Sequence, residues 1–325
     1  MRRWGGPGKR HCLECLGVGR SRYYRWRAGS GSPRSVGARP RPPHALLPQE
    51  RAAVVRYAKA HPNPRHRELA WKMVDEDVAY VSASSVYRVL CEEGLIASWP
   101  GRRRKRSRQA AEKAVRPDQR WQSDIRYLRV AGRRYYLVVF VDEYSRYIVH
   151  HELMSYLDGA TLSLEAQRAL ERLGPGRGPV IQSDNGSGYV SDEFKRVLRE
   201  HGLSHVRIRP HCPEENGLVE RAHRTLAEAL DEEELRNLEQ ARGELAELVR
   251  WYNEERLHSA LHYLRPVDYY RGDPATLQEA RRRKLAEARH HRRERNLGIR
   301  QTTLAFEAHD PEARRSLISA AKCPA

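Results

Sequence analysis

The chain has 325 residues, 39% of them hydrophobic, and its 60 Lys and Arg residues outnumber its 42 Asp and Glu residues, giving a formal net charge of +18. This length allows two or three domains, and the charge indicates a polyanionic partner such as nucleic acid. The longest apolar run, residues 135–141, is far shorter than the ~20 residues of a membrane helix, and the N-terminus lacks a secretory signal. Five scattered cysteines argue against a disulfide framework, so we expect a cytoplasmic protein without membrane association.

Residues 1–29 form a strongly basic segment, and residues 1–49 contain eleven Lys or Arg residues against a single acid, Glu14. Apolar residues at helical spacing precede the break "GVG", and "RSRYYRWR" follows it. This pattern is typical of a helix-turn-helix whose second helix enters a DNA groove, and an unstructured basic tail explains it equally well. The candidate DNA contacts here are Arg20, Arg22, Arg25 and Arg27.

Cys12 and Cys15 form a CxxC pair beside His11. A tetrahedral zinc site needs four ligands, and no second Cys or His pair completes the set. We therefore interpret these residues as ordinary helix residues.

Residues 30–46 are rich in Gly, Ser and Pro, without apolar periodicity, and are predicted to be a linker. Residues 47–97 contain three short helical patterns with basic exteriors, which predict a small all-α DNA-binding domain; a generic helical domain is the alternative. Residues 98–117 are a basic linker, whose stretch 101–108 holds six basic residues. Its candidate DNA contacts are Arg102, Arg103, Arg104 and Lys105.

Past Pro117 the patterns become those of strands. Residues 119–130, 135–143 and 147–154 predict an antiparallel meander whose nearly apolar middle strand is central. A helix, a strand, a helix, a strand and a long helical region then follow in the order 159–173, 179–184, 191–202, 203–210 and from about 217 onward. This order predicts an α/β, RNase H-like fold, a five-stranded mixed sheet flanked by helices, over residues 118–272.

Residues 273–325 are predicted to be a basic helical tail, with basic clusters at 281–284 and 289–295. A run of charge is often only a solvated helix face. Because basic clusters recur in three separate segments, and the first segment contains almost no acid, contact with phosphates is the favoured interpretation.

Three carboxylates occupy positions from which they could converge. Asp124 lies within the first predicted strand, Asp184 ends the fourth, and Glu220 lies near the start of the helix after the fifth. Enzymes that cut or join phosphodiesters commonly use two divalent cations about 4 Å apart, and Mg²⁺ prefers oxygen ligands. The spacing alone decides nothing, because acids are frequent in this chain. The context favours a site, because Gly186 and Gly188 after Asp184 would let the backbone approach a phosphate.

The remaining acids have structural interpretations. Asp142 and Glu143 are expected to fasten a turn, Glu214 and Glu215 to belong to the loop before the helix, and Glu228 and residues 231–235 to form a solvated helix face. His223 and Arg224 follow Glu220 by one turn on the same face, where we expect contact with the DNA backbone.

The segments "WQSDIRYL", "SDNGSGYVSDEF" and "ENGLVERAHRTL" resemble, in order, the three acidic motifs of the DDE integrase core of the retroviral-integrase superfamily, in particular of bacterial insertion-sequence transposases. Residues 251–270 resemble the segment that closes this core, and residues 16–27 and 81–96 resemble the N-terminal helical segments. The likeness covers roughly residues 10 to 272.

This resemblance implies that Asp124, Asp184 and Glu220 bind two Mg²⁺ or Mn²⁺ ions and catalyse nicking at the ends of a mobile element, followed by attack of the freed 3′-OH on target DNA. It implies DNA as partner, a homo-oligomer that pairs two ends, association with the bacterial nucleoid, and an upstream helix-turn-helix protein as a fusion or co-acting partner.

Three departures from the family pattern concern the subgroup and the specificity for DNA ends: Leu257 stands where the family usually has Pro, His262 where it has Gly, and residues 63–69 where it has an aromatic-Gly run. Two alternatives stay open, a catalytically silent DNA-binding regulator of transposition and an RNase H-like nuclease that only cleaves.

Overall fold

The computed structural model describes residues 13, 23–24, 42–96, 113–173, 178–209, 212 and 215–309, with side chains described as far as residue 302. These residues fall into two compact units: one comprises Leu46–Ala288, and the other comprises Met1–Ala45 with Arg289–Ala325. The predicted DNA contacts in residues 20–27 and 102–105 lie outside the described residues. No described helix is both long enough and apolar enough to cross a membrane.

Three helices near the N-terminal end of the larger unit share a core of their own. They are α3 (Pro48–Ala60), α4 (His66–Asp75) and α5 (Ala83–Glu92). Ser82 caps α5 by accepting a hydrogen bond from the backbone N–H of Ser85, which satisfies one of the helix's otherwise free donors. Apolar residues from all three helices are buried together, among them Val54, Met73 and Val86.

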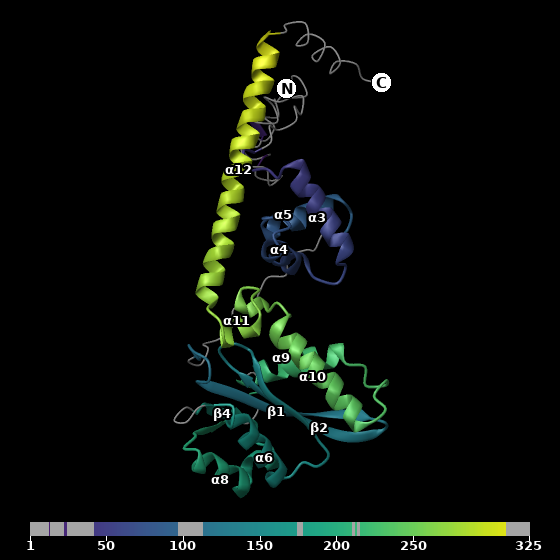
Figure 1. Cartoon of the computed structure of the whole chain (residues 1–325), viewed down its shortest axis with the longest axis vertical. Helices are drawn as coiled ribbons and strands as arrows, with labels where there is room; N and C mark the ends of the chain where they lie inside the picture. The colour runs from purple at the N-terminus through teal and green to yellow at the C-terminus, as the bar shows by residue number, and fades with distance from the viewer. Residues whose placement is uncertain are drawn as a thin grey trace, which may run out of the picture. The chain divides into compact units, whose positions relative to one another are not determined.

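The five predicted strands form one mixed sheet (Figure 1), and they are β1 (Arg120–Val130), β2 (Arg133–Asp142), β3 (Ile148–Met154), β4 (Val180–Ser183) and β5 (His205–Arg207). The spatial order is β3-β2-β1-β4-β5. The β1–β2 and β2–β3 pairs are antiparallel, and the β1–β4 and β4–β5 pairs are parallel. The predicted RNase H-like architecture is confirmed.

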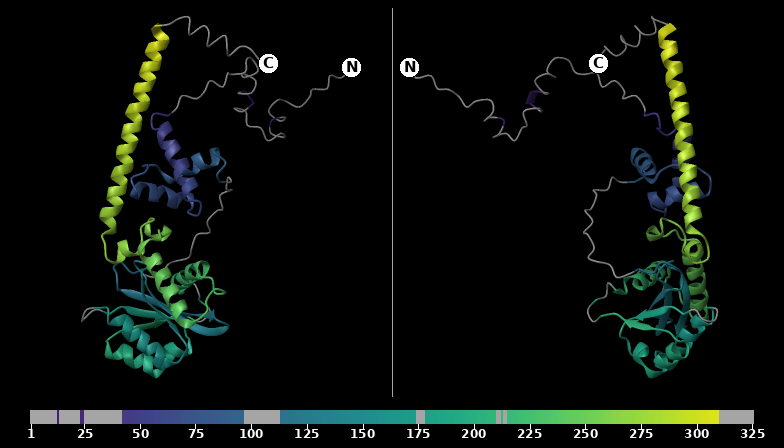
Figure 2. Two further views of the ribbon diagram at one scale, coloured as in Figure 1. Left: turned by 45° about the vertical axis from the view of Figure 1, so that its right-hand side comes forward. Right: turned by 90° about the vertical axis from the view of Figure 1, so that its left-hand side faces the viewer.

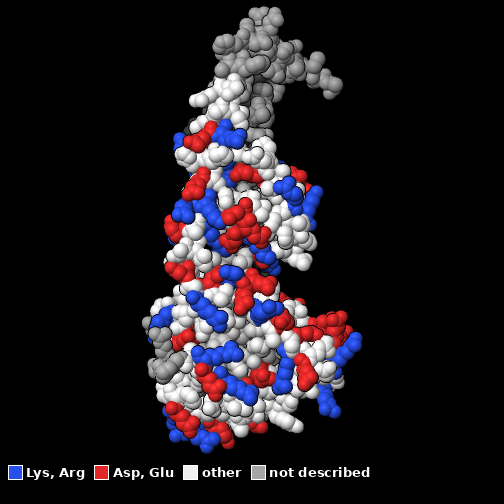
Figure 3. All heavy atoms as spheres, viewed as in Figure 1, with Lys and Arg blue, Asp and Glu red and all other residues white. Residues whose placement is uncertain are grey.

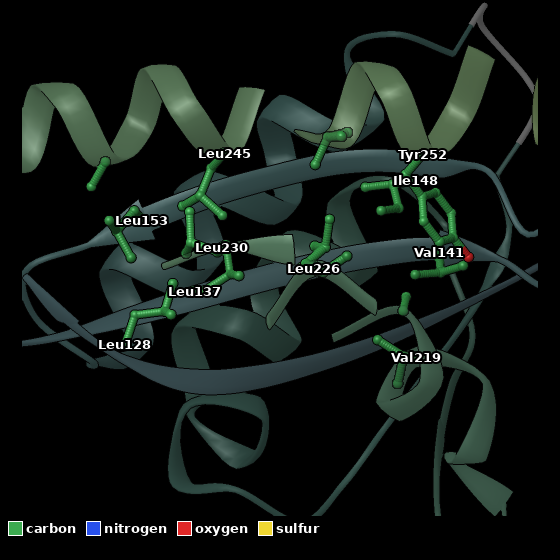
Figure 4. Packing of buried hydrophobic residues seen from close by; sticks show 14 of the residues in the cluster. Leu128, Leu137, Val141, Ile148, Leu153, Val219, Leu226, Leu230, Leu245 and Tyr252 are labelled. Carbon is green, nitrogen blue, oxygen red and sulfur yellow. The ribbon is translucent and has the colours of Figure 1, made fainter. Parts of the chain in front are cut away.

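Helices cover both faces of the sheet (Figures 1 and 2). On one face lie α6 (Gly159–Leu170) and α8 (Asp192–Glu200), which make the crossovers that parallel strands require. On the other face lie α9 (Gly217–Ala229) and α10 (Leu238–Glu254). Figure 4 shows the cluster beneath them, in which Leu226 and Leu245 meet residues of β1, β2 and β3. Short elements complete the unit: α7 (Ser187–Val190), η2 (Ser259–Leu261), α11 (Pro266–Tyr270) and the start of α12 (Pro274–His309).

The acidic run 231–235 is not on a helix, contrary to the prediction. The helix α9 ends at Ala229, and the run forms turns before α10. The reason is Leu235, which is only 2% exposed and joins the sheet core, while its carbonyl accepts a hydrogen bond from Ala131. Burying Leu235 requires the chain to leave the helix direction here.

Two acids, the buried Asp142 and the half-buried Asp118, close the core. Asp142 is fully buried and accepts hydrogen bonds from the backbone N–H groups of Ser145 and Asp118, which confirms its turn-fastening role. Asp118, at the start of the core, accepts hydrogen bonds from Trp121 Nε1 and from the Tyr270 hydroxyl, each at 3.0 Å. The beginning and the end of the core are thereby joined.

Candidate active site

Asp124 and Asp184 come from adjacent parallel strands. The β1–β4 pairing places Trp121 beside Ile181 and Gln122 beside Gln182. β4 ends at Ser183, one residue before Asp184, and the same register continued by two residues would bring Asp184 opposite Asp124. Each aspartate ends an identical tripeptide, Gln-Ser-Asp, at 122–124 and 182–184. This repeat is a signal for strand pairing that sequence interpretation overlooked.

The charges of the three predicted acids act on one another. Burial and the negative charges of Asp184 and Glu220 raise the pKa of Asp124 to about 6, although a hydrogen bond from the Ile125 backbone opposes the shift. Glu220 is exposed in the first turn of α9. The Asp124 carboxyl therefore lies within electrostatic range of both Asp184 and Glu220.

The two glycines after Asp184 have different roles. Gly186 donates its N–H to Asp184 Oδ1 at 2.9 Å, and a Cβ there would lie 3.0 Å from the same oxygen, so the glycine leaves room for the carboxylate. Gly188 is buried, and a Cβ there would lie 2.9 Å from Leu162 Cδ2. Gly188 therefore serves the packing of α7 on α6 rather than the predicted approach of a phosphate.

The donor set suits hard divalent cations, because it consists of carboxylate oxygens only. Within the described ranges, no three His, Cys, Asp or Glu side chains are grouped tightly enough to hold a single ion. A two-ion site does not require such a group, since two protein carboxylates for each ion suffice when one of them is shared. Asp124, whose pKa is raised by the charges of both other acids, is the candidate for the shared ligand.

His223 lies inside the protein, contrary to the predicted DNA contact. It is 3% exposed, and its Nε2 donates to the backbone carbonyl of Asp124 at 3.2 Å. Burial lowers its pKa to about 4, so the ring is neutral near pH 7, and its Nδ1 has no hydrogen-bond partner among the described residues. His223 is buried because the α9 face that carries it, with Val219 and Leu226, packs against the sheet.

Arg224, the next residue, points away from this face and is exposed. Its side chain forms no ion pair with any acid in the part of the chain that the structure describes. Arg224 lies one turn from Glu220 on α9, so it remains the candidate for phosphate contact beside the acids.

Comparison with known proteins finds relatives for the part of the chain that carries these residues. Two integrase core domain families match residues 114–213 and 201–266. Over 158 residues, 48% of this chain, the sequence is 27% identical to a putative transposase, InsK, for insertion sequence element IS150 of Escherichia coli (strain K12), and these residues span 56% of that relative. Over 159 residues it is 28% identical to the transposase for insertion sequence element IS904 of Lactococcus lactis, spanning 63% of it.

Among solved structures, the HTLV-2 integrase catalytic core domain in complex with magnesium is similar to 49% of this chain over 99% of its own length, with 18% identity and a TM-score of 0.41. The two matched models together cover residues 114–266, the part of the chain that forms the mixed sheet and the helices α6 to α10. The chain is thus similar to insertion-sequence transposases and to integrase core domains. It spans little more than half the length of the two curated transposases described above.

Proposed function

We propose that the chain is a DNA transposase that binds the ends of a mobile element, nicks them and joins the freed 3′-OH to target DNA by metal-dependent phosphoryl transfer. The observation that carries the proposal is the meeting of Asp124 and Asp184, from paired parallel strands, with the charge of Glu220. The transposase names of the curated relatives support the reaction class.

In this proposal Asp124, Asp184 and Glu220 hold two Mg²⁺ or Mn²⁺ ions. Such ions, when bound, activate an attacking oxygen and neutralise charge on the leaving oxygen. The protein's part is to keep the three carboxylates on rigid elements, two strands and the first turn of a helix, so that little reorganisation accompanies binding. His223 supports Asp124 through its backbone carbonyl.

The distribution of charge favours DNA binding largely by segments outside the core. Residues 118–272 contain 22 Lys and Arg residues and 26 Asp and Glu residues, so the core is slightly negative and the flanking segments carry the whole excess. On the face visible in Figure 3, basic and acidic side chains are interspersed. The proposed phosphate contacts are therefore Arg224 at the site and residues of the basic segments that precede the core: Arg20, Arg22, Arg25, Arg27, Arg102, Arg103, Arg104 and Lys105.

A mobile element has two ends, so concerted joining needs at least two active sites. We include in the proposal a homo-oligomer assembled on DNA. An upstream helix-turn-helix protein, as a fusion or a co-acting partner, would add recognition of the element ends.

The test uses the purified chain with DNA that carries the terminal repeats flanking its own gene, with Mg²⁺ or Mn²⁺. Asp184→Asn should abolish nicking and joining while leaving DNA binding intact. Asp192→Asn is the matched control, because it also replaces an aspartate by an asparagine, but at an exposed side chain of α8. Undiminished activity of Asp184→Asn would contradict the assignment of Asp124, Asp184 and Glu220 as metal ligands. If the wild type binds DNA without cleaving it, the chain is instead a catalytically silent regulator of transposition. If the wild type nicks DNA without joining it, the chain is a nuclease that only cleaves.

A further inference from the structure

Two buried glutamine side chains converge on one carbonyl oxygen beside the acids. Gln122 on β1 and Gln182 on β4 are register partners and are 6% and 7% exposed. Their Nε2 atoms both donate to the backbone carbonyl of Glu215, at 3.3 Å from Gln122 and 2.7 Å from Gln182. Each glutamine stands two residues before a predicted metal ligand, on the same side of its strand, because side chains alternate along a strand.

The accepting carbonyl lies where the chain enters α9. The Glu215 side chain accepts hydrogen bonds from Arg209 N at 2.9 Å and from Arg209 Nε at 2.7 Å, which ties it to the segment after β5. The next residue, Asn216, accepts the hydrogen bond from Glu220 N that opens the helix, at 3.2 Å. A fixed Glu215 carbonyl therefore fixes the first turn of α9, which carries Glu220.

A packing role alone does not explain the glutamines. Gln122 Oε1 is buried without a hydrogen-bond partner among the described residues, a cost that a methionine of similar size would avoid. The reversed amide orientation would place Oε1 against the Glu215 carbonyl oxygen, where the two acceptors repel. The Glu215 carbonyl therefore sets the orientation of the Gln122 side-chain amide. A hydrogen-bond donor at position 122 is explained by this carbonyl.

The first turn of α9 needs to be held in place against the repulsion among the three acids. Three carboxylates held in one region repel one another until cations arrive, and this repulsion acts on the exposed first turn of α9, the most easily displaced of the three supports. The amide hydrogen bonds join that turn to the same two strands that carry the aspartates.

We propose that Gln122 and Gln182 are positioning residues, a paired-amide clamp that holds the Glu215 carbonyl and thereby sets the place of Glu220 relative to Asp124 and Asp184. The clamp rests on the proposed metal-dependent function. The clamp gives both residues of the repeated Gln-Ser-Asp tripeptide a role. In each copy the aspartate is a proposed metal ligand, and the glutamine helps to position Glu220, the third proposed ligand.

The experiment measures Mn²⁺ binding to the full chain without DNA, from the electron paramagnetic resonance signal of free Mn²⁺, and the Mn²⁺ concentration for half-maximal nicking. Gln122→Met, Gln182→Met and the double variant keep the side-chain length and remove the donor. Gln167→Met is the matched control on an exposed position of α6. Thermal unfolding of each variant identifies any that fail to fold.

We expect the double variant to bind Mn²⁺ about tenfold more weakly, equivalent to about 1.4 kcal/mol. The metal concentration for half-maximal nicking should rise by the same factor, while the rate at saturating metal stays within about twofold of wild type. Gln182→Met should weaken Mn²⁺ binding more than Gln122→Met does, because the hydrogen bond from Gln182 to the Glu215 carbonyl is the shorter of the two. If the double variant does not fold, the two single variants test the clamp.

Unchanged Mn²⁺ affinity in all three variants, with wild type binding normally, would overturn the clamp and leave the proposed function intact. A lowered unfolding temperature with unchanged affinity in the folded protein would show a merely structural role and overturn it as well. Absence of Mn²⁺ binding by the wild type would overturn the proposed function, and the clamp with it.

Discussion

Asn253 on α10 pairs with the backbone of Ile148 on β3 as a neighbouring strand would. Its Oδ1 accepts from Ile148 N at 2.8 Å and its Nδ2 donates to Ile148 O at 3.0 Å. β3 is an edge strand whose pairing with β2 shifts register between Phe140 and Val141, so the asparagine satisfies backbone groups that this irregularity would leave free. At 4% exposure, water cannot replace it.

Asn253→Leu should therefore destabilise the core by about 2 to 4 kcal/mol, because two buried backbone groups lose their partners. Urea unfolding followed by circular dichroism measures this. Asn253→Asp keeps the acceptor and loses the donor, so it should still accept from Ile148 N while repelling Ile148 O. An unfolding midpoint for Asn253→Leu equal to that of wild type would contradict this account.

Divalent metal should stabilise the folded chain. At a free Mg²⁺ concentration about 100 times its dissociation constant, binding to the native state alone adds about 2.7 kcal/mol to the free energy of unfolding. Asp184→Asn should lose this gain, and Asp192→Asn should keep it. Calorimetric unfolding with and without Mg²⁺ provides the measurement, and equal gains in both variants would place the metal elsewhere.

Substitutions of Arg224 and of His223 should have different effects on DNA binding, although the two residues are neighbours in the chain. Arg224→Ala should weaken DNA binding for every sequence tested and reduce the slope of log affinity against log salt by about 0.9, because one phosphate contact is lost. His223→Leu should leave this slope unchanged and lower stability by about 1 to 3 kcal/mol, because the Asp124 carbonyl loses its donor. Fluorescence anisotropy at several salt concentrations separates the two, and a lower slope for His223→Leu would show that the ring reaches DNA.

His151 on β3 should make stability depend on pH. Burial, His150 and Arg172 lower its pKa from 6.5 to about 4. The unfolded chain therefore takes up this proton at a higher pH than the folded chain does, so the free energy of unfolding falls as the pH drops from about 6.5 to about 4, by up to about 3 kcal/mol.

The measurement is urea unfolding across this pH range. His151→Gln should flatten the slope, and His44→Gln, at an exposed position, should not. Because other groups also titrate, the comparison uses the difference in slope between variants. An identical slope for His151→Gln and wild type would rule out His151 as the source.

The sequence predicted the strands and their order well because alternation and apolar runs are local signals. It also predicted the strand and helix positions of Asp124, Asp184 and Glu220. It could not predict that Gln122 and Gln182 meet at the Glu215 carbonyl, because that contact depends on the register of two strands about 60 residues apart.

Two of the errors, those on His223 and on the run 231–235, have a related cause. His223 and the acidic run 231–235 were assigned by their polarity, whereas their places are decided by neighbours that are buried, Val219 and Leu226 for the histidine and Leu235 for the run. Which face of a helix packs, and where a helix stops, is decided by the core as a whole.

The hydrogen bond between the Tyr270 hydroxyl and Asp118 joins residues 152 positions apart at the two boundaries of the mixed-sheet core. A domain whose entry and exit meet can be carried between unrelated flanking segments, because neither flank has to cross it. The hydrogen bond from Tyr270 therefore lets the sheet and its helices be joined to different flanking segments without a change in the core itself.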